Sequence, residues 1–160
     1  MAEEAVSRRR LAERSPDDRE ALRELSRSLR RAAGYRFASG DFGATAALLE
    51  EDRSLWRRLA EGAGHDPRTS REQVWGLWGL GDARRHLGDL AAARAAYEEA
   101  LTLSRRGAET AGEDPEGLVS TSLERLGDLH SASRDTPAAI TAYEEAVRAS
   151  GTVAETDRFR

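Results

Sequence analysis

Histidines and carboxylates are the residues of this chain that could carry out catalysis or hold a metal ion. The three histidines, His65, His86 and His130, are scattered and lack the spacing of a metal site. Runs such as YEEA and LLEE are typical of the solvated side of a helix rather than of a paired acid and base. The chain has no cysteine, phosphate-binding glycine loop or nucleophile motif. We therefore predict that the protein is not an enzyme and uses no cofactor or metal.

Composition narrows the partners that this chain is expected to have. The formal net charge of −4 argues against direct binding to nucleic acid. No run approaches the roughly 18 apolar residues that cross a bilayer, and residues 1–14 contain no apolar segment typical of a secretory signal. We expect a cytoplasmic protein that binds neither nucleic acid directly nor a membrane.

Two tryptophans form the most distinctive candidate contact site. Trp75 and Trp78 are three residues apart, so they share one face of a helix, and Gly76 and Gly79 accompany them in the run VWGLWGLG. Tryptophan is enriched at the energetic centres of protein interfaces, which favours an aromatic platform for a partner. Both rings could instead fill the core beside Trp56. We predict that one ring is buried and that the other contacts a partner.

The elements that must position these residues are written as a repeat. The core AYEEA occurs twice, in the aligned segments 77–106 and 123–151, and segment 29–58 aligns more weakly. Asp41, Asp89 and Asp135 mark equivalent turns, separated by 48 and 46 residues. A glycine at such a turn can end one helix, and the aspartate after it can cap the next helix. Each unit is therefore predicted to be two antiparallel helices, which in the middle unit run over about 70–87 and 90–110.

Small residues recur where the two helices of each unit would meet. Ala33, Gly81 and Gly127 fall at equivalent points of the first helix, and alanines recur on the second. The residues predicted to fill the space beside them are Leu49, Tyr97 and Tyr143. A single helix pair cannot bury its apolar face alone, so the units are expected to stack into a continuous core.

This arrangement resembles the tetratricopeptide repeat family. The residues that carry the resemblance in the middle unit are Leu77, Leu80, Gly81, Gly88, Asp89, Ala93, Tyr97 and Ala100. The usual repeat has 34 residues, whereas these units recur at 46–48, which is similar to repeats of actinobacterial regulatory proteins. The resemblance implies an all-α, right-handed superhelical stack of antiparallel helix pairs (an α-solenoid). Its expected parts are an N-terminal helix (1–14, a cap or partial repeat), three hairpins (15–62, 63–111 and 112–151) and a C-terminal tail (152–160).

The resemblance also implies that the first helix of each unit lines a concave groove that holds a peptide or a partner's helix. Arginines in such a groove can bind carboxylates through two parallel hydrogen bonds, or they can simply be solvated. The groove residues implied are Arg27, Arg30, Arg31, Phe37, Trp75, Trp78, Asp82, Arg85, His86, Glu124, Arg125 and Asp128.

The function that follows is a non-catalytic protein-interaction module with a regulatory or adaptor role. Two alternatives remain at this point. The chain could be a self-assembling structural scaffold, because repeat arrays with apolar end faces stack on one another. It could also be the sensor or regulatory segment of a larger transcriptional regulator.

Overall fold

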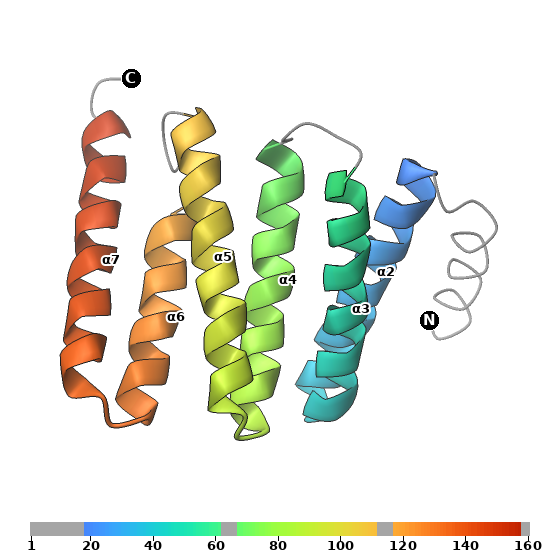
Figure 1. Ribbon diagram of the computed structural model, residues 1–160, viewed down its shortest axis with the longest axis horizontal. Helices are drawn as coiled ribbons and strands as arrows, with labels where there is room; N and C mark the ends of the chain where they lie inside the picture. Colours follow the sequence, from blue (N-terminus) through green and yellow to red (C-terminus); the bar gives the residue numbers. More distant parts are fainter. Residues whose placement is uncertain (1–17, 62–66, 112–116, 158–160) are drawn as a thin grey trace. The chain divides into compact units, whose positions relative to one another are not determined.

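The protein is all-α in the part of the chain that its structure describes. This computed structural model describes residues 18–61, 67–111 and 117–157, and it describes side chains in 18–59, 71–110 and 117–150. Its regular elements in these ranges are six helices joined as antiparallel pairs (Figure 1). The predicted all-α helical-repeat fold is thus confirmed. The chain forms two compact units, Met1–His65 and Asp66–Arg160, which are described separately.

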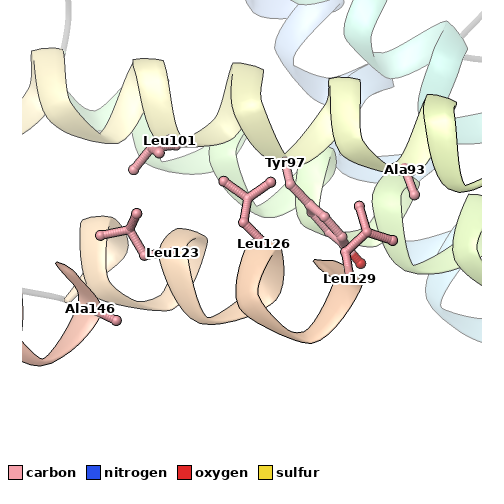
Figure 2. Packing of buried hydrophobic residues seen from close by; sticks show 7 residues of the cluster. All are labelled: Ala93, Tyr97, Leu101, Leu123, Leu126, Leu129 and Ala146. Atoms are coloured by element: carbon pink, nitrogen blue, oxygen red, sulfur yellow. The ribbon is translucent and has the colours of Figure 1, made fainter. Parts of the chain in front are cut away.

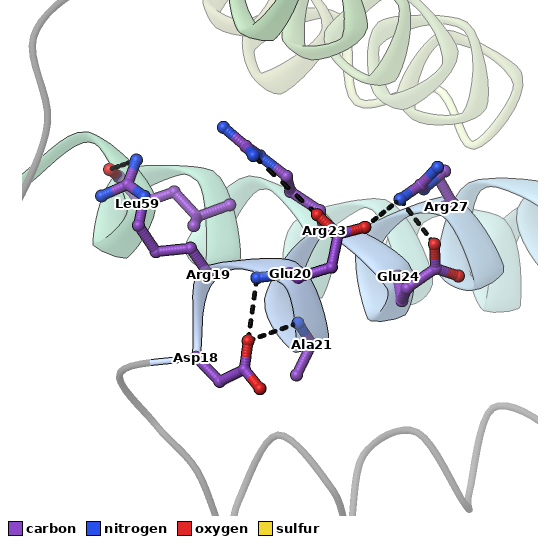
Figure 3. A network of polar contacts seen from close by, with 8 residues as sticks. All are labelled: Asp18, Arg19, Glu20, Ala21, Arg23, Glu24, Arg27 and Leu59. Carbon is purple, nitrogen blue, oxygen red and sulfur yellow. Dashed lines mark hydrogen bonds and ion pairs between the residues drawn. The ribbon is translucent and has the colours of Figure 1, made fainter.

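The first unit contains the helix pair α2 (Arg19–Ala38) and α3 (Phe42–Glu61). Helix α2 begins after Asp18, whose carboxylate accepts hydrogen bonds from the backbone N–H groups of Glu20 and Ala21 at 3.0 and 3.1 Å (Figure 3). Such a cap satisfies N–H groups that have no partner within the helix. Apolar residues at helical spacing form the core between α2 and α3, namely Leu22, Leu25, Leu29, Leu55, Trp56 and Leu59.

The second unit contains α4 (Pro67–His86), α5 (Leu90–Ala111), α6 (Leu118–Ala132) and α7 (Thr136–Asp157). Helices α4 and α5 form one hairpin, α6 and α7 form the next, and α6 packs on both α4 and α5. The stacking of one hairpin on the other buries a shared core. Its members, drawn in Figure 2, are Ala93, Tyr97 and Leu101 of α5, Leu123, Leu126 and Leu129 of α6, and Ala146 of α7.

The turn within each hairpin is built as the sequence predicts. Asp41, Asp89 and Asp135 each accept a hydrogen bond from the backbone N–H three residues later, at 3.1, 3.0 and 3.3 Å. Gly40 and Gly88 precede two of these aspartates with φ values of 79° and 80°. Glycine adopts this left-handed conformation without steric cost. The third turn has Arg134 at this position, with φ at 59°.

The predicted contact between small and bulky residues is confirmed in both hairpins of the second unit. A Cβ atom on Gly81 would lie 2.2 Å from the Cε1 atom of Tyr97, and one on Gly127 would lie 2.6 Å from the same atom of Tyr143. In the first unit Ala33 and Leu49 occupy the corresponding positions and are buried. Glycine therefore lets each tyrosine ring lie directly on the backbone of the neighbouring helix.

The observed helix bounds agree closely with the predicted ones in the middle hairpin, where 70–87 and 90–110 correspond to α4 and α5. Helix α7 continues to Asp157 and so includes most of the segment expected as a tail. The expected N-terminal helix over 1–14 and the last three residues lie outside the described residues. Within the described part of the chain, no helix is both long enough and apolar enough to cross a membrane.

Candidate partner-binding surface

The two tryptophans of α4 have different environments. Trp75 is 47% exposed, and the guanidinium carbon of Arg71 lies 6.0 Å from its ring centroid. Trp78 is half-buried and packs on the core that the two hairpins share. Its indole Nε1 donates a hydrogen bond to Ser122 Oγ on α6 at 3.0 Å. Trp75 is therefore the tryptophan of this pair that is available to a partner.

Asp82 and Arg125 join the first helices of the two hairpins. The Arg125 Nη1 atom donates to both carboxylate oxygens of Asp82, at 2.7 and 2.6 Å. Its guanidinium carbon lies 5.1 Å from the centroid of the Trp78 ring, within the range of a cation–π interaction. A charge-assisted bond of this kind is stronger than a neutral one. Asp82 and Arg125 thus hold α4 and α6 together.

Tyr97 of α5 completes this polar network. Its side chain is almost fully buried beside Gly81, and its phenol donates a hydrogen bond of 2.6 Å to Asp82 Oδ1. Burial raises the pKa of Tyr97 above its ordinary value, and the hydrogen bond to Asp82 and the charge of that carboxylate raise it further. The phenol is therefore a hydrogen-bond donor at neutral pH. It has the properties of a structural group rather than of a general base.

Further predicted residues of the second unit remain on the surface. Arg85 and His86 on α4 are exposed, as are Glu124 and Asp128 on α6. Asp128 accepts a hydrogen bond from the phenol of Tyr143 at 2.7 Å. This hydrogen bond is the main cause that raises the pKa of Tyr143. Burial and the charges of Asp128 and Glu124 make smaller contributions in the same direction.

In the first unit the predicted arginines differ in what they contact. Arg27 donates to Glu20 at 2.8 Å and also pairs with Glu24, both on its own helix (Figure 3). Arg30 is largely buried, with its Nε atom 3.7 Å from the carboxylate of the buried Asp52.

The other two predicted residues of this unit, Arg31 and Phe37, differ in exposure. Arg31 is exposed. Phe37 is half-buried and packs edge-on against Phe42, with the ring centroids 5.2 Å apart. The arginines implied as groove residues thus include Arg30, which is largely buried within the hairpin.

Two sets of polar partners were not predicted from the sequence. Ser104 and Ser122 are buried, and their hydroxyl oxygens lie 3.3 Å apart between α5 and α6. Asp52, which is the ionic partner of Arg30, was also not singled out in the sequence. Ser104 and Ser122 fall on apolar faces, and that placement is the one signal that could have found them.

The site has the chemistry of a contact surface. Across the described residues, no group of three or more histidine, cysteine, aspartate or glutamate side chains is arranged to hold a metal ion. Its exposed groups are an indole, an arginine, a histidine and two carboxylates. Groups of these kinds recognise a polypeptide by burial and ion pairing.

Repeated antiparallel helix pairs, two of them with a glycine under a tyrosine ring, define a helical-repeat protein. The tetratricopeptide repeat family model matches residues 72–150, from the first third of α4 to the described end of the α7 side chains. These residues therefore belong to the tetratricopeptide repeat family. A comparison with curated proteins gives no match. Members of this family generally mediate protein–protein interaction.

Proposed function

We propose that the protein is a non-catalytic adaptor or regulatory module that binds a peptide or helical segment of a partner protein. The binding surface is the exposed side of α4 and α6, the first helices of the two hairpins in the second unit. The observation that carries this proposal is the exposure of Trp75 on α4, within the matched repeats. A tryptophan left half in water on a helical-repeat surface gains free energy when a partner covers it.

The surrounding charges indicate what the partner segment contains. Arg85 is exposed on the same helix and has no ionic partner among the described side chains. Asp82 and Arg125 are already paired with each other between α4 and α6. The expected ligand is therefore a protein segment with an apolar side chain for Trp75 and a carboxylate for Arg85. Neither nucleic acid nor a membrane is an expected ligand.

A peptide-display selection on the immobilised full chain tests the proposal. Selected peptides are then measured by fluorescence anisotropy against Trp75→Ala and Arg85→Glu. We expect Trp75→Ala to weaken binding by about thirtyfold, as for a hot-spot residue. Arg85→Glu should weaken the acidic peptides most.

Arg106→Glu is the matched control, because Arg106 is exposed on α5 and outside the proposed surface. Its binding should equal that of the wild type. Selected peptides that bind all four proteins equally would contradict the proposal, provided that circular dichroism shows equal helicity.

A further inference from the structure

In the second unit, the second helix of the first hairpin, α5, is covered by the first helix of the next hairpin, α6. Tyr97 and Leu101 of α5 are buried, with Tyr97 1% exposed. They pack against three leucines of α6, which are Leu123, Leu126 and Leu129 (Figure 2). The same helix supplies Arg125, which pairs with Asp82. A covering helix thus brings both apolar side chains and an arginine.

Helix α7 repeats the pattern of α5 but lacks such a cover among the described residues. Tyr143 and Val147 stand 46 residues after Tyr97 and Leu101, and they are 37% and 72% exposed. Ile140, one turn earlier, is 52% exposed. These three residues have the i, i+3, i+7 spacing of one helical face. We refer to Ile140, Tyr143 and Val147 as the C-terminal stripe.

The charge beside the C-terminal stripe is also incomplete. Asp128 accepts a hydrogen bond from Tyr143, just as Asp82 accepts one from Tyr97. Asp82 has an arginine as well, whereas no described arginine pairs with Asp128. Glu124 and Glu144 are exposed nearby on the same two helices. The stripe and its acidic border therefore match a helix that presents an apolar group and an arginine.

Helix α2 of the first unit carries that combination in the same register. Since Ala33 corresponds to Gly127, Arg31 and Tyr35 of α2 correspond to Arg125 and Leu129 of α6. Arg31 is exposed and forms no ion pair with a described residue, and Tyr35 is 60% exposed. The chain thus carries both halves of a repeat-to-repeat contact, one on α2 and the other on α6 and α7.

We propose that copies of this chain associate head to tail, with α2 of a second copy covering the C-terminal stripe of the first. In this contact Arg31 of the second copy pairs with Asp128, and Tyr35 of the second copy packs on the stripe. The contact is heterologous, because the two copies use different surfaces. Each dimer therefore still presents one α2 face and one C-terminal stripe, and further copies can add to both. A tail-to-tail dimer would instead place Asp128, Glu124 and Glu144 against the same acidic residues.

A charge exchange on the full chain tests this proposal by sedimentation velocity over a concentration series. Asp128→Arg alone places arginine opposite arginine, and Arg31→Asp alone places aspartate opposite aspartate. Each variant should weaken self-association about tenfold or more, because like charges across an interface repel. An equimolar mixture of the two variants should restore association, because every contact between unlike copies is again a pair of opposite charges.

Matched controls separate this contact from a general effect of charge. Glu98→Arg and Arg106→Asp change exposed residues of α5 by the same amount of charge and should associate like the wild type. Val147→Glu, at the most exposed position of the stripe, should weaken association without unfolding the chain.

Three results would overturn the proposal. A wild-type chain that stays monomeric up to about 1 mM has no such contact. Association that Val147→Glu abolishes but Arg31→Asp leaves intact would show a tail-to-tail dimer instead. Failure of the two charge variants to restore each other would remove the pairing of Arg31 with Asp128. None of these results bears on peptide binding at Trp75.

Discussion

At the scale of single residues, the closest approach between helices depends on the absence of one methyl group. Gly81 and Gly127 each lie under a tyrosine ring, and a Cβ atom added to either glycine would be too close to that ring. The two rings differ in how deeply they are buried. Tyr97 is buried under α6 and bonded to Asp82. Tyr143 on α7 is 37% exposed. An added methyl group should therefore be more damaging at position 81 than at position 127.

We expect Gly81→Ala to lower the free energy of unfolding by about 1–3 kcal/mol, the usual cost of overpacking a core. Gly34→Ala is the matched control, because a Cβ atom there would have no neighbour within 4 Å. Alanine favours a helix over glycine by about 1 kcal/mol, so Gly34→Ala should raise the stability. Urea denaturation followed by circular dichroism measures both changes. Equal effects of the two substitutions would mean that the Tyr97 ring does not hold its place.

The turn between α6 and α7 contains a residue that glycine would suit better. Arg134 has φ at 59°, a conformation that costs an L-residue roughly 1–2 kcal/mol, and its side chain is exposed. We expect Arg134→Gly to raise the stability by about 1 kcal/mol and the melting temperature with it. Gly88→Ala at the equivalent turn should have the opposite sign, and thermal melts of both variants check the pair. An unchanged or lower melting temperature for Arg134→Gly would contradict this account.

At the scale of helices, the sequence was sufficient to predict the hairpins but not which residues form ion pairs between one helix and another. Helix pairs, turns and the glycine–tyrosine contacts follow from short-range periodicity and from residues with one strong conformational role, such as Asp89 and Gly88. The partner of Arg125 is 43 residues away on another helix. A periodic pattern shows which face a side chain lies on, but not which residue the neighbouring helix places opposite. The ion pair between Arg30 and Asp52 was not predicted for the same reason.

The hydrogen bond from Tyr97 to Asp82 gives the second unit a specific dependence on alkaline pH. Because the pKa of Tyr97 is raised in the folded state, its phenol keeps its proton there after it has lost it in the unfolded chain. The stabilisation is therefore complete below the ordinary pKa near 10 and is lost as the pH rises above it. We expect the wild type to lose stability more steeply than Tyr97→Phe above about pH 10.

Urea midpoints at a series of pH values compare the two proteins. At neutral pH, Tyr97→Phe should cost only about 0.5–1.5 kcal/mol, because Asp82 keeps its bonds to Arg125. Parallel pH curves for the two proteins would show that this phenol titrates as in an unfolded chain.

At the scale of the whole molecule, the chain has two compact units with cores of their own. The first unit depends on one helix pair, whereas the second contains two hairpins and the core between them. In helical-repeat proteins, stability grows with the number of contacts between neighbouring repeats. The second unit is therefore expected to hold most of the protein's stability.

Expression of residues 66–160 alone tests this expectation. This fragment exceeds the roughly 70–80 residues below which a single core rarely suffices, and residues 1–65 fall short of that size. We expect the longer fragment to be helical and to unfold cooperatively, and the shorter one to be less stable. Leu126→Ala removes a buried leucine of the core between hairpins and should destabilise the longer fragment by about 2–5 kcal/mol. The loss should be the same in the full chain, whereas Leu29→Ala there should leave the amide protection of α4 to α7 unchanged. A fragment that melts without a cooperative transition would show that the second unit needs the first one to fold.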